Sequence, residues 1–216
     1  MTDAPSTVGF IILLTILGLL PFLMVTMTAF LKISVVMFII RNALGLQQTP
    51  PTMVLYSIAL ILTVFVSLPL IEDVSNRLAA HPLDTSSLDK LQESANVVKD
   101  PVKAYLIRFA KPGERQFFLS STARIWPESA RANVKDDDFI ILLPAFVSSE
   151  LTRAFEIGFL LFLPFLIIDI IVSNILMAMG MMMVSPTLIS LPLKLFLFVA
   201  VDGWSRLMHG LILSYV

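Results

Sequence analysis

Apolar residues gather in four long stretches, which are separated by short polar turns and by one long polar segment. In chain order they are 8–40, 53–71, 157–184 and the shorter 188–201. A helix that crosses a bilayer needs about 20 mainly apolar residues, and the first three stretches reach that length. The pattern therefore predicts two hydrophobic helical hairpins in an integral, multi-pass membrane protein or membrane complex.

The polar segment between the hairpins, residues 72–138, holds 21 of the 31 charged side chains. We predict an all-α fold with three parts: a hairpin over 1–71, a small helical insert over 72–138 and a second hairpin over 139–216. The first hairpin turn carries Arg41 and no acid. Because cytoplasmic loops are enriched in basic residues, we expect that turn in the cytoplasm and the insert outside it.

Within the insert, apolar positions recur at i, i+3 and i+7, which predicts helices over 86–98 and 100–109. Pro101 suits the first turn of the second helix, since its missing N–H has no partner there. A third short helix is expected over 114–122, before Pro127. The run Asp136-Asp137-Asp138 is interpreted as a solvated boundary that caps the next helix, and a metal site there is the weaker alternative.

Composition supports the membrane assignment. Hydrophobic residues make up 57% of the 216-residue chain, against ~45–50% in soluble domains, and the mean hydropathy is +0.89. There is no cysteine, which excludes disulfides and thiol catalysis. The net charge of −1 gives no indication of nucleic-acid binding. A cleaved signal peptide has basic residues before its apolar core. Here the first apolar stretch is preceded by Asp3 and by no basic residue, so we expect this stretch to remain in the mature protein.

Several charged residues lie in or beside the apolar stretches: Lys32, Glu150, Arg153, Glu156, Asp169, Lys194, Asp202 and Arg206. Each costs at least ~2.5–3.5 kcal/mol if it faces lipid, so they must pair or face water. Glu150, Arg153 and Glu156 are spaced by three, so they form an acid–base–acid row on one helix face. This row predicts either a contact with a neighbouring subunit or a local ladder of i,i+3 ion pairs within the helix. Asp169 and Lys194 are expected to pair, within one subunit or between two. Prolines inside the same stretches kink helices and favour a protein packed against other protein.

Five methionines fall within seven residues between the last two apolar stretches, at positions 177, 179, 181, 182 and 183. Methionine is unbranched and polarizable, so a cluster of it forms a deformable apolar surface. One interpretation is a gate that seals against water and reopens. The other is that these side chains fill gaps in a packed helix pair.

No catalytic motif is found: the chain has no P-loop, HExxH or GxSxG sequence, and His81 and His209 are its only histidines. We expect no enzyme activity, no metal and no cofactor. Ionisable residues inside a membrane suggest ion pathways. An alternative function is therefore an ion or proton translocator that uses Glu156, Asp169 and Lys194.

Two long blocks carry a family resemblance. Residues 30–51 read FLKISVVMFIIRNALGLQQTPP, and residues 142–204 read LLPAFVSSELTRAFEIGFLLFLPFLIIDIIVSNILMAMGMMMVSPTLISLPLKLFLFVAVDGW. Both resemble the FliP/SctR family, and together they cover about two fifths of the chain. The closing sequence GWSRLMHGLILSYV is more similar to the virulence branch, SctR or YscR, than to the flagellar branch.

The resemblance implies a subunit of the type III secretion export apparatus in the bacterial inner membrane. It implies several copies, five being expected, in a pseudo-helical assembly with small SctS-like and SctT-like subunits, in contact with larger export-gate and switch components and with membrane lipid. Much of the complex is expected on the periplasmic side. Unfolded secreted proteins would pass through its entrance channel. In the family the methionine-rich turn forms a gasket that narrows the pore, and the matching residues here are Met181, Met182 and Met183, with Met179 a weaker match.

Overall fold

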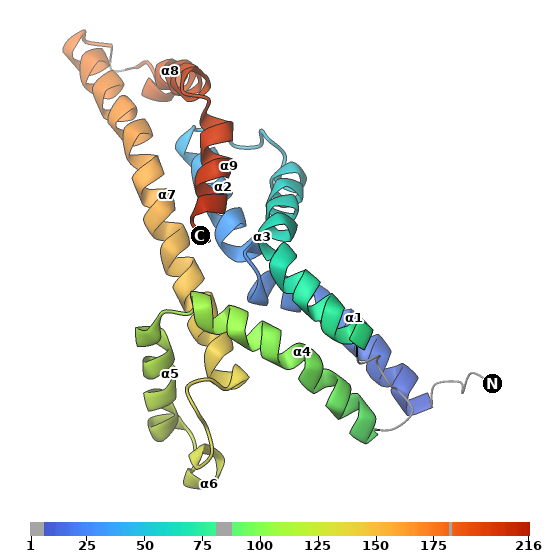
Figure 1. The fold of residues 1–216 in the computed structure, drawn as a ribbon. Helices are drawn as coiled ribbons and strands as arrows, with labels where there is room; N and C mark the ends of the chain where they lie inside the picture. Colours follow the sequence, from blue (N-terminus) through green and yellow to red (C-terminus); the bar gives the residue numbers. More distant parts are fainter. Residues whose placement is uncertain (1–6, 81–87, 182) are drawn as a thin grey trace. The chain divides into compact units, whose positions relative to one another are not determined.

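The computed structural model describes residues 7–80, 88–181 and 183–216, and every regular element in them is a helix (Figure 1). The elements are α1 (Thr7–Met27), α2 (Phe30–Ala43), α3 (Thr52–Ala80), α4 (Leu88–Phe109), α5 (Pro112–Ile125), α6 (Glu128–Arg131), α7 (Phe139–Ala178), α8 (Pro186–Ala200) and α9 (Gly203–Leu213). The predicted all-α class is confirmed. The three-part division of the chain stays a prediction.

In the part of the chain that the structure describes, two helices, α3 and α7, are long and apolar enough to cross a membrane. Two more spans result if each bent helix pair counts as one: residues 21–27 with α2, and α8 with α9. The second pair is bent by 62°. The structure thus gives two to four candidate spans, in agreement with the apolar pattern of the sequence.

One expectation for the insert is wrong. Residues 88–109 form the single helix α4 with Pro101 inside it, where two helices were expected. A proline inside a helix removes one backbone hydrogen bond and costs ~3 kcal/mol. Here Pro101 is itself buried, and Leu106 on the same helix is fully buried. Packing of a continuous helix face therefore outweighs the lost bond. Residues 86 and 87, where the first of the two helices was expected to begin, lie outside the described residues.

The other helical expectation for the insert is confirmed. The predicted helix over 114–122 is the core of α5, which begins at Pro112 and ends at Ile125. Proline at the first helical position is favourable because its missing N–H needs no partner there. Trp126 is the C-cap of α5, and Pro127 follows as the N-cap of the one-turn helix α6.

The chain forms two compact units, and each is drawn from separate parts of the sequence. The first contains the described residues of Met1–Leu31 and Ser67–Glu150, and the second contains Lys32–Val66 and Leu151–Val216. The long helices α3 and α7 each contribute to both units. Each unit is described below by itself.

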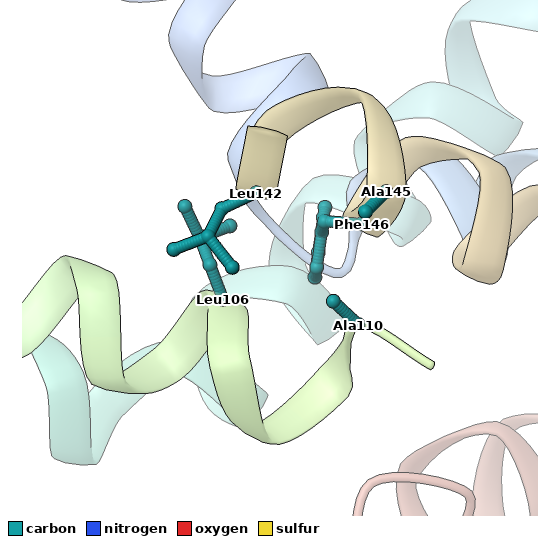
Figure 2. Packing of buried hydrophobic residues seen from close by; sticks show 5 residues of the cluster. All are labelled: Leu106, Ala110, Leu142, Ala145 and Phe146. Atoms are coloured by element: carbon teal, nitrogen blue, oxygen red, sulfur yellow. The ribbon is translucent and has the colours of Figure 1, made fainter. Parts of the chain in front are cut away.

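The core of the first unit lies between α4 and the first turns of α7. Figure 2 shows Leu106 of α4 and Ala110, the residue that follows this helix, against Leu142, Ala145 and Phe146 of α7. All five are buried, and burial of a large apolar side chain contributes about 1.5–3 kcal/mol. This contact fixes the polar insert to the start of the second long apolar helix.

Hydroxyl groups of α7 hold the start of α5 in the same unit. The backbone N–H of Lys111, the N-cap of α5, donates a hydrogen bond of 2.8 Å to Oγ of Ser149. The neighbouring Ser148 donates to Oε2 of Glu114, at 2.7 Å. The turn between α4 and α5 is therefore tied to one face of α7.

The acidic run before α7 serves the fold of the insert. Asp137 forms an ion pair with Lys103 at 2.6 Å, and Asp136 forms one with Arg115 at 3.3 Å. Asp138 begins α7 through its backbone carbonyl, while its carboxylate accepts the N–H of the residue three positions earlier. The side chain thus caps the preceding turn. Among the described residues, no group of three His, Cys, Asp or Glu side chains is placed to hold a metal ion.

The second unit contains α2, part of α3, the rest of α7, α8 and α9. Its core includes Ile33, Val36 and Ile40 of α2. At Gly158 of α7 an added Cβ would lie 2.4 Å from Cδ1 of Ile39, so a larger residue would require the side chain of Ile39 or the helices to shift. Gly158 therefore lets α2 and α7 approach closely with Ile39 in its present position.

Candidate functional site

The methionine-rich segment begins as the C-terminal turn of α7. Gly180, with φ of +75°, ends the helix in the left-handed conformation that glycine adopts without strain. Its N–H donates to the carbonyl of Met177, and the N–H of Met181 donates to the carbonyl of Leu176. This pair of bonds is the Schellman motif, which satisfies the last carbonyls of a helix. The turn is consequently a defined structure.

The methionine side chains of this turn are largely exposed in the single chain. The exposed fraction is 67% for Met179 and 38% for Met181, and Met183 is fully exposed. Met182 lies outside the described residues. A methionine that fills a gap in a core is buried, so the exposure of these side chains argues against that interpretation within one subunit.

The chain does bury part of this segment. Met181 and Leu176 line a small hollow together with Val184 and Pro186, and Leu176 is buried there. Ser185 is the N-cap of α8, and Pro186 occupies its first turn. The segment is therefore held at both ends by helix termini, while the tip between them presents methionine outward.

A buried ammonium group joins three helices of the second unit. Nζ of Lys194 in α8, which is 5% exposed, lies 2.5 Å from Oδ2 of Asp169 in α7. The same ammonium donates at 3.0 Å to the carbonyl of Ala43, the last residue of α2. A cation at a helix C-terminus is stabilised by the carbonyls that point out of it. The structure therefore pairs Asp169 with Lys194 inside one chain.

Lys32 is held by the C-terminal residues of the chain. This side chain of α2 is fully buried, and its Nζ donates at 3.5 Å to the carbonyl of Ser214. Its ammonium also lies 3.4 Å from the ring centroid of Tyr215, a cation–π contact. These contacts join the start of α2 to the last residues after α9.

The row formed by Glu150, Arg153 and Glu156 lies on α7 with the predicted spacing. Glu150 is fully buried, Arg153 is half-buried and Glu156 is exposed, and each makes at least one polar or electrostatic contact. Burial raises the pKa of Tyr105 to about 12, and the charge of Glu150 acts in the same direction. The tyrosine is therefore a neutral hydroxyl at physiological pH.

The residues of the proposed ion relay are not gathered at one place. Glu156 and Asp169 lie 13 residues apart on the continuous helix α7, and at 1.5 Å per residue this separates them by about 20 Å. Asp169 instead contacts Lys194. The contacts that the structure gives Asp169 and Lys194 are those of an ion pair within one chain.

Two features of the second unit were not predicted from the sequence. The partners of Lys32 are a backbone carbonyl and an aromatic ring near the C-terminus, which no spacing rule connects to it. The other is Asp202, which takes a left-handed conformation with φ of 53° between α8 and α9. Aspartate tolerates this conformation better than most residues, so its presence at a sharp turn was a usable, weak signal.

Comparison with known proteins gives a consistent result. A family model described as FliP family matches residues 13–211. The chain is 56% identical to "Probable translocation protein y4yL" of Sinorhizobium fredii, over 98% of this chain and 95% of that protein. It is 46% identical to "Yop proteins translocation protein R" of Yersinia pestis, over 100% of this chain and 99% of that protein. It is also 42% identical to "Virulence protein YscR" of Salmonella typhimurium, over the full length of both.

Proposed function

Because the chain belongs to the FliP family, as a type III secretion export-apparatus protein of the virulence branch, we propose that it is a core subunit of the export gate. The family is a structural component of a secretion apparatus, which is not a class of enzymes. The candidate spans and the family both fit a bacterial inner-membrane protein. In this role the chain helps to form the entrance channel through which unfolded proteins leave the cell.

The proposed assembly contains several copies, five being expected, arranged pseudo-helically with SctS-like and SctT-like subunits and in contact with larger export-gate and switch components. Much of it stands on the periplasmic side of the membrane. Exposed apolar surface supports such an assembly: only 17% of the most apolar window of α7 and 28% of that of α3 is buried within the chain. Surface of this kind requires lipid or other subunits around it.

The observation that carries the proposal of a gate is the outward presentation of methionine on a fixed turn. The Schellman motif at Gly180 holds the turn, while Met179, Met181 and Met183 remain exposed. When several copies bring such turns together, their thioether side chains close a narrow apolar constriction. Because methionine has no fixed shape, the same side chains accommodate any passing sequence.

The mass of the detergent-extracted complex, measured by native mass spectrometry after co-expression with neighbouring apparatus subunits, tests this proposal. We expect one discrete, ring-sized assembly that contains several copies of this chain and the small partner subunits. A monomer or dimer that carries no partner would contradict it.

Arg153→Glu is expected to weaken that assembly. The charged row of α7 then becomes entirely acidic at 150, 153 and 156, and like charges three residues apart repel. If the row contacts a neighbouring subunit, recovery of the full-mass complex falls severalfold. Arg131→Glu, on exposed α6, is the matched control. Normal recovery of the Arg153→Glu complex would reduce the row to a local ladder within α7.

A further inference from the structure

The second unit contains an apolar pocket that the methionine-rich turn does not use. Its volume is about 530 Å³, within the ~300–1,000 Å³ typical of small-molecule sites. Leu161 and Phe165 of α7, Leu197 of α8, and Leu207 and Gly210 of α9 contribute to its walls. Ile40 of α2 also lines it, so the hollow lies among four helices of one unit.

The pocket is a consequence of the sharp bend between α8 and α9. The chain turns at Asp202, and α9 leaves at 62° to α8. Gly203 fixes the bend, because an added Cβ would lie 2.4 Å from the ring of Phe198. At Gly210 an added Cβ would meet nothing within 4 Å. One glycine thus allows the bend, and the other leaves space in the wall of the pocket.

Arg206 is the charged residue of the pocket lining, and it is exposed. Among the described parts of the chain, no carboxylate forms an ion pair with its guanidinium. Ser214 is the other polar residue of the lining, and its carbonyl already accepts from Lys32. The pocket consequently combines an apolar interior with one available cation at its mouth.

This combination is complementary to an anionic phospholipid. Arginine matches the geometry of a phosphate, and basic pockets between membrane helices bind anionic lipid headgroups. A helix from another subunit is the competing occupant. An apolar helix face would leave the exposed guanidinium of Arg206 without an anion, whereas a phospholipid supplies a phosphate to it. The charge at the pocket therefore favours the lipid.

We propose that this pocket binds an anionic phospholipid, with an acyl chain among α7, α8 and α9 and the phosphate on Arg206. The site is independent of the methionine-rich turn and of any role in export. Its occupation would hold α9 against α7, and so would stabilise the bent pair in a membrane.

Trp204 provides a reporter for the test. Its ring lies edge-on to Phe198, a lining residue of the pocket, with 5.3 Å between ring centroids. The chain has two tryptophans, so Trp126→Phe leaves Trp204 as the only one. The full chain in detergent micelles is titrated with phosphatidylglycerol or phosphatidylcholine that carries brominated acyl chains. We expect saturable quenching, with phosphatidylglycerol binding about fivefold more tightly, the effect of one cation near an anionic headgroup.

Two variants test the contact with the acyl chain and the contact with the headgroup separately. Gly210→Leu fills the pocket and should abolish saturable quenching; it also raises helix propensity, which protects the fold. Its control is Gly18→Leu in α1, where an added Cβ likewise meets nothing within 4 Å. Arg206→Gln should remove the preference for phosphatidylglycerol, and Arg124→Gln in α5 should not.

Equal binding of both lipids, or unchanged quenching in Gly210→Leu, would overturn the proposal. If Gly210→Leu altered the mass of the assembly and left quenching unchanged, the pocket would instead receive a neighbouring subunit.

Discussion

Membranes that contain the assembled complex are expected to become permeable to small ions when Met181, Met182 and Met183 are replaced together by alanine. Alanine lacks the thioether arm that would close the constriction, and the loss is repeated in every copy. The expected change is from a closed state to a conducting pore. Because Met183 is fully exposed and Met181 partly so in the single chain, the substitutions should alter its stability by little.

Ion flux across vesicles that contain the purified complex measures this effect. Met53→Ala, at an exposed methionine at the start of α3, is the control and should leave the vesicles closed. The mass of the complex should be the same for all variants. A triple variant that assembles normally and stays closed to ions would refute the gasket.

Lys194→Met is expected to destabilise the second unit by about 2–3 kcal/mol. Removing one partner of a buried ion pair costs ~3–5 kcal/mol, and the cost is smaller here because the side chain of Asp169 retains 39% of its exposure. The carbonyl of Ala43 also loses its donor. Because methionine has a side chain of similar length to the lysine stem, the loss of stability measures the contribution of the ammonium charge.

A double-mutant cycle separates pairing from packing. Lys194→Met combined with Asp169→Leu removes both charges and should recover most of the lost free energy of unfolding, measured by denaturant titration in detergent. If the two losses simply add, Asp169 and Lys194 are not coupled. Asp169→Asn distinguishes the alternative function, because an ion relay would lose transport while the assembly remained intact.

The sequence predicted the helical class because the evidence for it is local. Apolar runs of membrane length, and i, i+3, i+7 repeats in the insert, determine helices without reference to distant residues. The two-helix expectation around Pro101 was wrong for a physical reason. Local chemistry favours a helix start at that proline, but burial of Pro101 and Leu106 on a continuous face of α4 outweighs it.

The contacts of the charged residues were less predictable, because they depend on how the helices meet. Spacing brought Asp169 and Lys194 into consecutive apolar stretches but left open whether they pair within one subunit or between two. The carbonyl of Ala43 as a third partner required the end of α2 to be in place. The pocket beside Arg206 depends on a bend at Asp202 and on two glycines, a combination that has no periodic pattern.

Cross-linking at the methionine-rich turn tests the central claim most directly. The chain has no cysteine, so Met183→Cys introduces its only thiol, and Met53→Cys is the matched exposed control. The complex is co-expressed with its partner subunits and oxidised in the membrane. If the turns of neighbouring copies meet around a pore, Met183→Cys gives covalent dimers of this chain, and Met53→Cys gives none. Absence of cross-links at Met183 in a complex of full mass would contradict the account.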